Sequence, residues 1–84
     1  MLRTSARGAA AHALAQAVRF TEHEMVVSLV DGRTVSVPLE WFRRLAKATR
    51  KQLENYKILG DGEGIHWPEI DEDISVEGLL RGSH

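Results

Sequence analysis

The stretch EMVVSLVDGRTVSVP, residues 24–38, determines how the first half of the chain folds. Large apolar residues alternate with polar or smaller ones on both sides of a DGR tripeptide, and this pattern predicts two antiparallel strands joined by a tight turn. We assign the first strand to residues 18–30 and the second to residues 34–38. Pro38 ends the second strand because proline has no N–H to donate to a ladder.

The length of the turn fixes the register of this hairpin. A two-residue loop would place apolar side chains opposite polar ones. A three-residue loop ending at Gly32 instead places Val27 opposite Val35 and Met25 opposite Val37, which gathers the apolar residues on one face. We therefore predict the three-residue loop, with Gly32 in the left-handed region of a G1 bulge.

The next stretch, PLEWFRRLAKA, changes the period of the apolar residues to that of a helix. Its predicted apolar face consists of Leu39, Phe42, Leu45 and Ala46. Thr49 and Gln52 have the spacing of a capping box, so a new short helix is expected to begin there. The helical region is therefore predicted to break near residues 48–49.

A second hairpin follows the helices. The segments YKILG (56–60) and GIHW (64–67) flank a glycine-rich turn, and Pro68 closes the second of these strands. Ser75 is a suitable N-cap for a closing helix, and Gly82 suits the position just after it. The element order is thus β-β-α-α-β-β-α, and the predicted fold class is α+β, a small single domain of two β-hairpins with short helices.

Three segments are expected along the chain. Residues 1–17 offer few large apolar groups and are predicted to form a flexible or partly helical arm, residues 18–82 a single α+β domain, and residues 83–84 a tail. The 84 residues include no cysteine to reinforce a small core, so we expect self-association, most simply a homodimer. No apolar run could span a membrane and no secretory signal is evident, so a cytoplasmic protein without a membrane partner is expected.

The net charge of −1 conceals two blocks of opposite sign. Residues 40–57 hold six basic and two acidic side chains, whereas residues 58–77 hold seven acidic side chains and no lysine or arginine. Opposed blocks favour association by charge complementarity. The near-neutral total argues against strong non-specific binding to nucleic acid.

No motif predicts catalysis or cofactor binding. The glycine-rich loop lacks the lysine of a phosphate-binding loop and carries two acids that would repel phosphate. An EF-hand beginning at Asp71 would require other residues at Val76 and Gly82. His66 could serve as a base or a metal ligand, but no nucleophile motif or metal-ligand spacing accompanies it. We therefore expect no enzyme activity, no catalytic residue, no metal and no cofactor.

The candidate functional residues are those suited to binding another macromolecule. Trp and Arg dominate interface hot spots, and an acidic segment can meet a basic surface. The predicted partner-binding residues are Trp41, Arg44, His66, Glu69, Asp71, Glu72 and Asp73. The alternative is nucleic-acid binding by the basic helix 42–51, through Arg43, Arg44, Lys47, Arg50 and Lys51.

The motifs DGR, PLEWF, GIHWP and DEDIS, in this order, closely resemble a bacterial family of small domains of unknown function, the one numbered twenty-four forty-two. The resemblance covers residues 18–82. It implies a small α+β domain, often encoded beside another short protein in toxin–antitoxin-like pairs, and it implies no catalytic residues. Members often have proline where this chain has Arg43 and Arg50. The expected function is therefore a non-enzymatic interaction module, the antitoxin-like partner of a small cognate protein; the alternative is a DNA-binding autoregulator.

Overall fold

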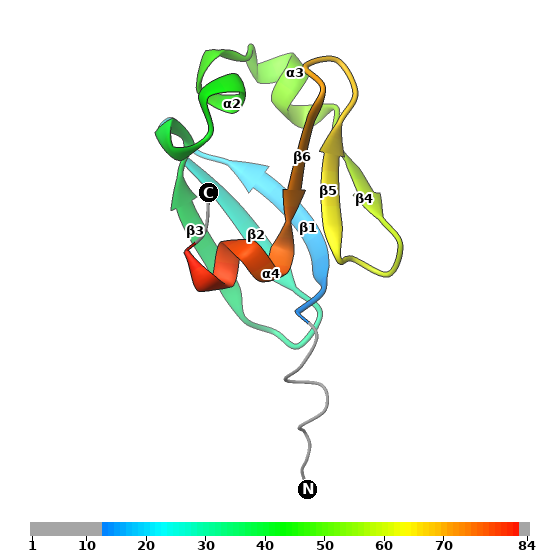
Figure 1. Cartoon of the computed structure of the whole chain (residues 1–84). Helices are drawn as coiled ribbons and strands as arrows, with labels where there is room; N and C mark the ends of the chain where they lie inside the picture. Colours follow the sequence, from blue (N-terminus) through cyan, green and yellow to red (C-terminus); the bar gives the residue numbers. More distant parts are fainter. Residues whose placement is uncertain (1–12, 83–84) are drawn as a thin grey trace, which may run out of the picture.

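The structure, a computed structural model, describes residues 13–82 and contains two three-stranded antiparallel sheets connected by short helices (Figure 1). The first sheet has the order β1-β2-β3, with β1 at Ala15–Phe20, β2 at Glu24–Leu29 and β3 at Thr34–Pro38. The second has the order β4-β5-β6, with β4 at Lys57–Leu59, β5 at Gly64–Trp67 and β6 at Glu72–Ser75. The helical elements are η1 (Leu39–Trp41), α2 (Arg43–Lys47), α3 (Arg50–Glu54) and α4 (Val76–Arg81). The predicted α+β class is confirmed.

The predicted register of the first hairpin is also confirmed. Val27 pairs with Val35 and Met25 with Val37 across β2 and β3. The N–H of Leu29 donates to the carbonyl of Arg33 at 2.8 Å, and Gly32 has a φ of 97°. The apolar side chains of both strands therefore face the core.

The prediction of one strand over residues 18–30 was wrong, because two strands occupy this region. The chain reverses between them, where the N–H of Thr21 donates to the carbonyl of Glu24 at 2.9 Å and the Thr21 hydroxyl accepts from the N–H of Glu24 at 3.0 Å. Strand β1 begins at Ala15, within the segment assigned to the arm. Its apolar pattern is weak because two of its six residues are alanine and two are polar, which leaves Val18 and Phe20 as its large apolar residues. The rest of the predicted arm, residues 1–12, and the tail lie outside the described residues.

The helical region divides as the sequence predicts. Helix α3 begins at the expected capping box, in which the Thr49 hydroxyl accepts from the N–H of Gln52 and the Gln52 side chain accepts from the N–H of Thr49. A further division precedes it, since Phe42 is extended (φ −123°, ψ 100°) and separates η1 from α2. Among the described residues, no helix is long and apolar enough to cross a membrane.

The second hairpin and the closing helix are confirmed, but the sequence analysis missed a strand between them. Strand β5 ends at Trp67, before Pro68, while Ser75 caps α4 and Gly82 is left-handed at its end (φ 78°). The end of the acidic segment, which was expected only to precede the α4 cap, instead lies in a strand: Glu72 and Asp73 begin β6, which pairs with β5. Its charged residues hid the strand pattern, in which Ile74 alone is buried.

The two sheets share one core. Trp67 is fully buried, its indole N–H donates to the carbonyl of Leu53 at 3.0 Å, and its ring packs edge-on against Phe20 with centroids 6.5 Å apart. Met25 and Ile65, one from each sheet, are also fully buried within this cluster. Burial of a large aromatic side chain contributes several kcal/mol to the stability of a domain, about 3–5 kcal/mol when measured by truncation to alanine.

Candidate interaction surface

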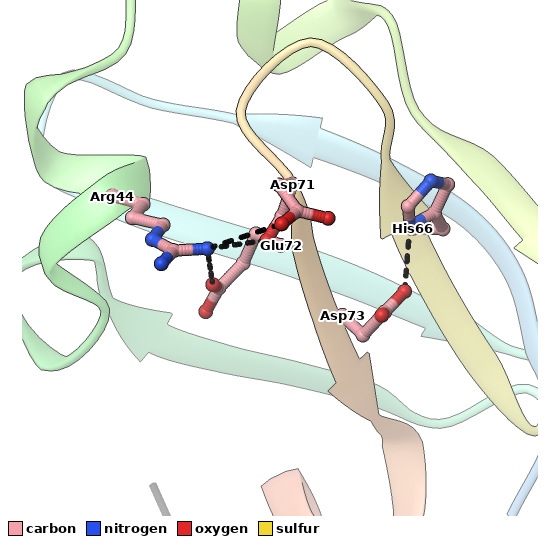
Figure 2. Close-up of polar contacts among 5 residues, drawn as sticks. All are labelled: Arg44, His66, Asp71, Glu72 and Asp73. Carbon is pink, nitrogen blue, oxygen red and sulfur yellow. Dashed lines mark hydrogen bonds and ion pairs between the residues drawn. The ribbon is translucent and has the colours of Figure 1, made fainter.

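The loop before β6 is anchored by Arg44. Its guanidinium donates to the backbone carbonyl of Asp71 at 2.5 Å, and the same nitrogen lies 4.0 Å from the carboxylates of Asp71 and Glu72 (Figure 2). Asp71 adopts a left-handed conformation (φ 53°), which aspartate tolerates better than most residues. A cation from α2 thus holds the turn that leads into β6.

His66 and Asp73 form a second polar contact, on the other side of β6. They are directly opposite each other on β5 and β6, and His66 Nδ1 lies 2.6 Å from Asp73 Oδ1. Lys57 is opposite His66 on β4, so basic, imidazole and acidic residues form a row across the second sheet. Trp67, next to His66, is buried on the opposite face, as the predicted alternation requires.

Asn55 anchors the start of the acidic segment. Its side-chain amide donates to the Glu69 carboxylate at 2.8 Å. Each of the four acids from residue 69 to residue 73 therefore contacts another residue of this chain. Sequence reasoning missed Asn55 and Lys57, because only the pairing of the second sheet and the path of the loop bring them to this segment.

The seven predicted partner-binding residues do not form one cluster. Glu72 and Asp73 are neighbours on a strand and point to opposite faces, so Arg44 with Glu72 and His66 with Asp73 lie on either side of β6 (Figure 2). The Asp71 carboxylate remains 91% exposed and that of Asp73 68% exposed. Trp41, at the end of η1, is 38% exposed.

The basic segment 42–51 is two short helices, α2 and α3, rather than one helix. Arg44 binds the loop before β6, as described above, and Arg50 donates to the carbonyls of Phe20 at 3.1 Å and Thr21 at 3.4 Å. Arg43, Lys47 and Lys51 are exposed on these helices. The five residues proposed to contact nucleic acid therefore include two whose guanidinium groups are bonded within the chain.

Within residues 13–82, no three His, Asp or Glu side chains are grouped so that they could hold a metal ion. The contacts of His66 are with one carboxylate, and the geometry offers it no second acidic ligand on the same face in that range.

Comparison with known proteins identifies the family. A family model described as "Protein of unknown function (DUF2442)" matches residues 15–84. The chain belongs to this family. The match begins at the residue where β1 starts, so that all six strands of the fold lie within the DUF2442 region.

Two solved structures share the fold. A protein of unknown function from Rhodospirillum rubrum, solved by crystallography, has a TM-score of 0.76 and 32% identity, with 86% of this chain and 89% of that chain covered. An uncharacterised protein from Chromobacterium violaceum, solved by solution NMR, has a TM-score of 0.71 and 25% identity. That match covers 82% of this chain and 65% of the other, so this chain spans less than two thirds of that relative's length. No curated protein matches the chain.

Proposed function

We propose that this DUF2442 protein is a non-enzymatic interaction module that binds a small cognate protein as an antitoxin-like partner. The observation that carries the proposal is the anchored acidic loop. Arg44 and Asn55 hold the loop in place, while the Asp71 carboxylate points into solvent with 91% of its surface exposed.

An anchored loop favours binding for an entropic reason. A flexible acidic segment must be ordered when it meets its partner, and that ordering costs about 0.5–1.5 kcal/mol for each immobilised side chain. The bonds from Arg44 and Asn55 remove part of this cost before binding. The exposed carboxylates would then attract a basic surface and set its orientation.

Trp41 supplies the apolar component of the proposed surface. It is half-exposed in η1, only three residues before Arg44. Tryptophan and arginine are the residue types most enriched where truncation weakens protein interfaces. A partner with a basic rim and an apolar pocket would satisfy both features.

The experiment mixes the purified chain with the protein encoded by the adjacent reading frame and measures the dissociation constant by calorimetry. The test variant carries Glu69→Gln and Asp71→Asn, because asparagine keeps the left-handed backbone at residue 71 while the charge is lost. We expect binding to weaken about tenfold or more, equivalent to about 1.4 kcal/mol. The matched control is Glu22→Gln, which removes an equally exposed acid from the β1–β2 turn.

A second variant separates anchoring from charge. Arg44→Ala makes the surface more acidic but releases the loop, so the proposal expects weaker binding to a basic partner. Tighter binding by this variant would contradict the role of the anchor, and an absence of any complex with the wild-type chain would overturn the proposed function itself.

DNA binding by the basic segment is the alternative. It is less favoured because Arg44 and Arg50 are bonded within the chain, which leaves Arg43, Lys47 and Lys51 as the cations of that set whose charged groups make no hydrogen bond or ion pair within residues 13–82. A gel shift with the chain's own promoter would favour DNA binding over the protein partner if Lys47→Glu abolished the shift. The shift should then be unchanged by the acidic-loop variant Glu69→Gln with Asp71→Asn.

A further inference from the structure

Strand β3 presents one side of its backbone to solvent. The N–H of Leu29 donates to the carbonyl of Arg33, and the N–H of Leu39 donates to the carbonyl of His23. Backbone groups in an antiparallel pair alternate in direction along the strand. Val35 and Val37 therefore direct their N–H and C=O groups toward β2, whereas Thr34 and Ser36 direct theirs away from it.

The outward groups have no partner in the part of the chain that the structure describes. Strand β3 is at the border of its sheet, and both Thr34 and Ser36 are exposed (Figure 1). Across residues 13–82, neither residue's N–H donates a hydrogen bond. Two donors and two acceptors thus form a short row ready for another strand.

Among residues 13–82, helix α4 packs against β3 but leaves Thr34 and Ser36 exposed, and the edge has few of the features that normally prevent strands from pairing between molecules. Natural edges are protected by charged side chains, bulges or a covering helix or loop. The segment TVSV, residues 34–37, contains no charge, and three of its four residues are β-branched. Only Pro38 limits the edge, by ending the ladder at a residue without an N–H.

We propose that β3 pairs with β3 of a second copy of this chain, antiparallel about a two-fold axis at Val35. In this register Thr34 of each copy lies opposite Ser36 of the other, and the outward groups form four hydrogen bonds. Val35 meets its own counterpart on the face that packs against the core. The first sheets of the two copies, each of the order β1-β2-β3, become one sheet of six strands.

The uncharged edge suits a second copy of the same strand better than a charged partner strand. The outward donors and acceptors of Thr34 and Ser36 are symmetric about Val35. The edge is therefore complementary to a second copy of itself under a two-fold axis. Charged neighbours that would select a partner of opposite charge are absent from residues 34–37. The strand pairing uses no residue of the acidic segment and shares only the neighbouring Trp41 with the proposed partner surface. The variants below change Thr34 and Ser36 alone, so their outcome is distinguishable from that of the proposed function.

Apolar side chains beside β3 extend the proposed contact. Stable interfaces bury about 1,600 Å² in total, which is more than two short strands provide. Of the four large apolar side chains exposed among the described residues, three belong to elements that adjoin β3. Val30 lies in the turn before it, Trp41 in η1 directly after it, and Leu80 in α4, which packs against it.

The first experiment measures the oligomeric state by sedimentation equilibrium. The wild-type chain, 9.4 kDa, is expected to sediment at twice its mass at the highest concentrations. Ser36→Pro removes one outward N–H and puts a ring in its place without touching the bonds to β2, so we expect the dimer dissociation constant to rise about a hundredfold. Ser36→Thr is the matched control, because it keeps the N–H and should remain dimeric. Circular dichroism checks that both variants fold.

The second experiment tests the register by charge. Thr34→Lys with Ser36→Lys places lysine opposite lysine across the axis, and Thr34→Glu with Ser36→Glu places glutamate opposite glutamate. Each double variant alone is expected to be monomeric, and an equimolar mixture is expected to form a heterodimer. A wild-type chain that is monomeric at every concentration would overturn the proposal, even if another protein covers β3. So would a dimer that persists in Ser36→Pro and in both charged variants.

Discussion

The two border strands of the first sheet are treated in opposite ways. The outward edge of β1 is covered by the second half of the chain. The N–H of Val18 donates to the Tyr56 hydroxyl at 3.2 Å, and the N–H of Ala15 donates to the carbonyl of Gly62 at 2.8 Å. The carbonyl of Phe20 accepts from the guanidinium of Arg50. The outward edge of β3 has no such cover in the described residues. The edge of β1, with three separate contacts, belongs to the folded core of the chain. The edge of β3, exposed and uncharged, is suited to association.

The most damaging way to uncover β1 is Gly62→Ala. Gly62 has a φ of 117°, and a Cβ there would lie 2.6 Å from the carbonyl oxygen of Ala15 and 2.8 Å from its nitrogen. We expect a loss of about 3 kcal/mol from backbone strain and overpacking together, measured as the free energy of unfolding in urea.

Gly32→Ala is the matched control for that variant. Gly32 also has a positive φ, 97°, but nothing lies within 4 Å of its would-be Cβ. Only the backbone strain remains, so a loss of about 1 kcal/mol is expected. Equal losses in the two variants would show that the approach of Gly62 to β1 contributes nothing of its own.

Tyr56→Phe removes one cover from β1 without changing the shape of the core. The Val18 N–H then loses the hydroxyl that accepts its hydrogen bond in a partly buried position. The expected loss is about 1 kcal/mol in the free energy of unfolding, with faster hydrogen exchange at the Val18 amide. An unchanged exchange rate at Val18 would mean that the hydroxyl does not protect this edge.

The pair Arg43→Pro and Arg50→Pro sharpens the comparison further. Both residues open a helix after an extended residue, Phe42 or Thr49, so proline fits either backbone. Arg43→Pro should be neutral or stabilising by about 0.5 kcal/mol. Arg50→Pro should be less stable than Arg43→Pro by about 0.5–1 kcal/mol, because it removes the guanidinium from the end of β1. Thermal unfolding of both variants measures the difference.

The smallest effect is expected at the turn that leads into β3. The backbone N–H of Arg33, followed by its guanidinium, lowers the pKa of Asp31 below its ordinary value of 3.8. A carboxylate with a lowered folded-state pKa stabilises the protein above its unfolded-state value, and this stabilisation is lost as the pH falls through the lowered pKa. Asp31→Asn should therefore be slightly less stable than wild type at neutral pH and equal to it in strong acid. A constant difference across that range would contradict the linkage.

The sequence predicted the parts of the fold that local patterns specify. Val27 and Val35 fixed the register of β2 and β3, Thr49 and Gln52 fixed the start of α3, and Ser75 fixed the start of α4, because each depends on neighbours within a few residues. Strands β1 and β6 were not predicted, because their formation depends on distant residues rather than on near neighbours. Alanines in one and acids in the other give little apolar alternation, and both strands owe their stability to partners across the sheet.

The candidate surface was predicted only as a set of residue types. The sequence indicated that Arg44 and Asp71 were worth attention, but not that they contact each other across 27 positions. It also could not place Asn55 beside Glu69, which requires the path of the loop after β5. The exposed edge of β3 follows from pairing direction, a property that appears only once the register and the neighbouring strands are known.

The distance along the chain between β1 and its covers has a consequence for synthesis on the ribosome. The three strands of the first sheet are consecutive and can pair soon after they emerge, whereas Tyr56 follows Val18 by 38 residues and Gly62 follows later still. Until those residues leave the exit tunnel, the nascent sheet has two bare edges instead of one. Unpaired strand edges are templates for pairing between chains, so we expect the aggregation hazard of the growing chain to be greatest in that interval.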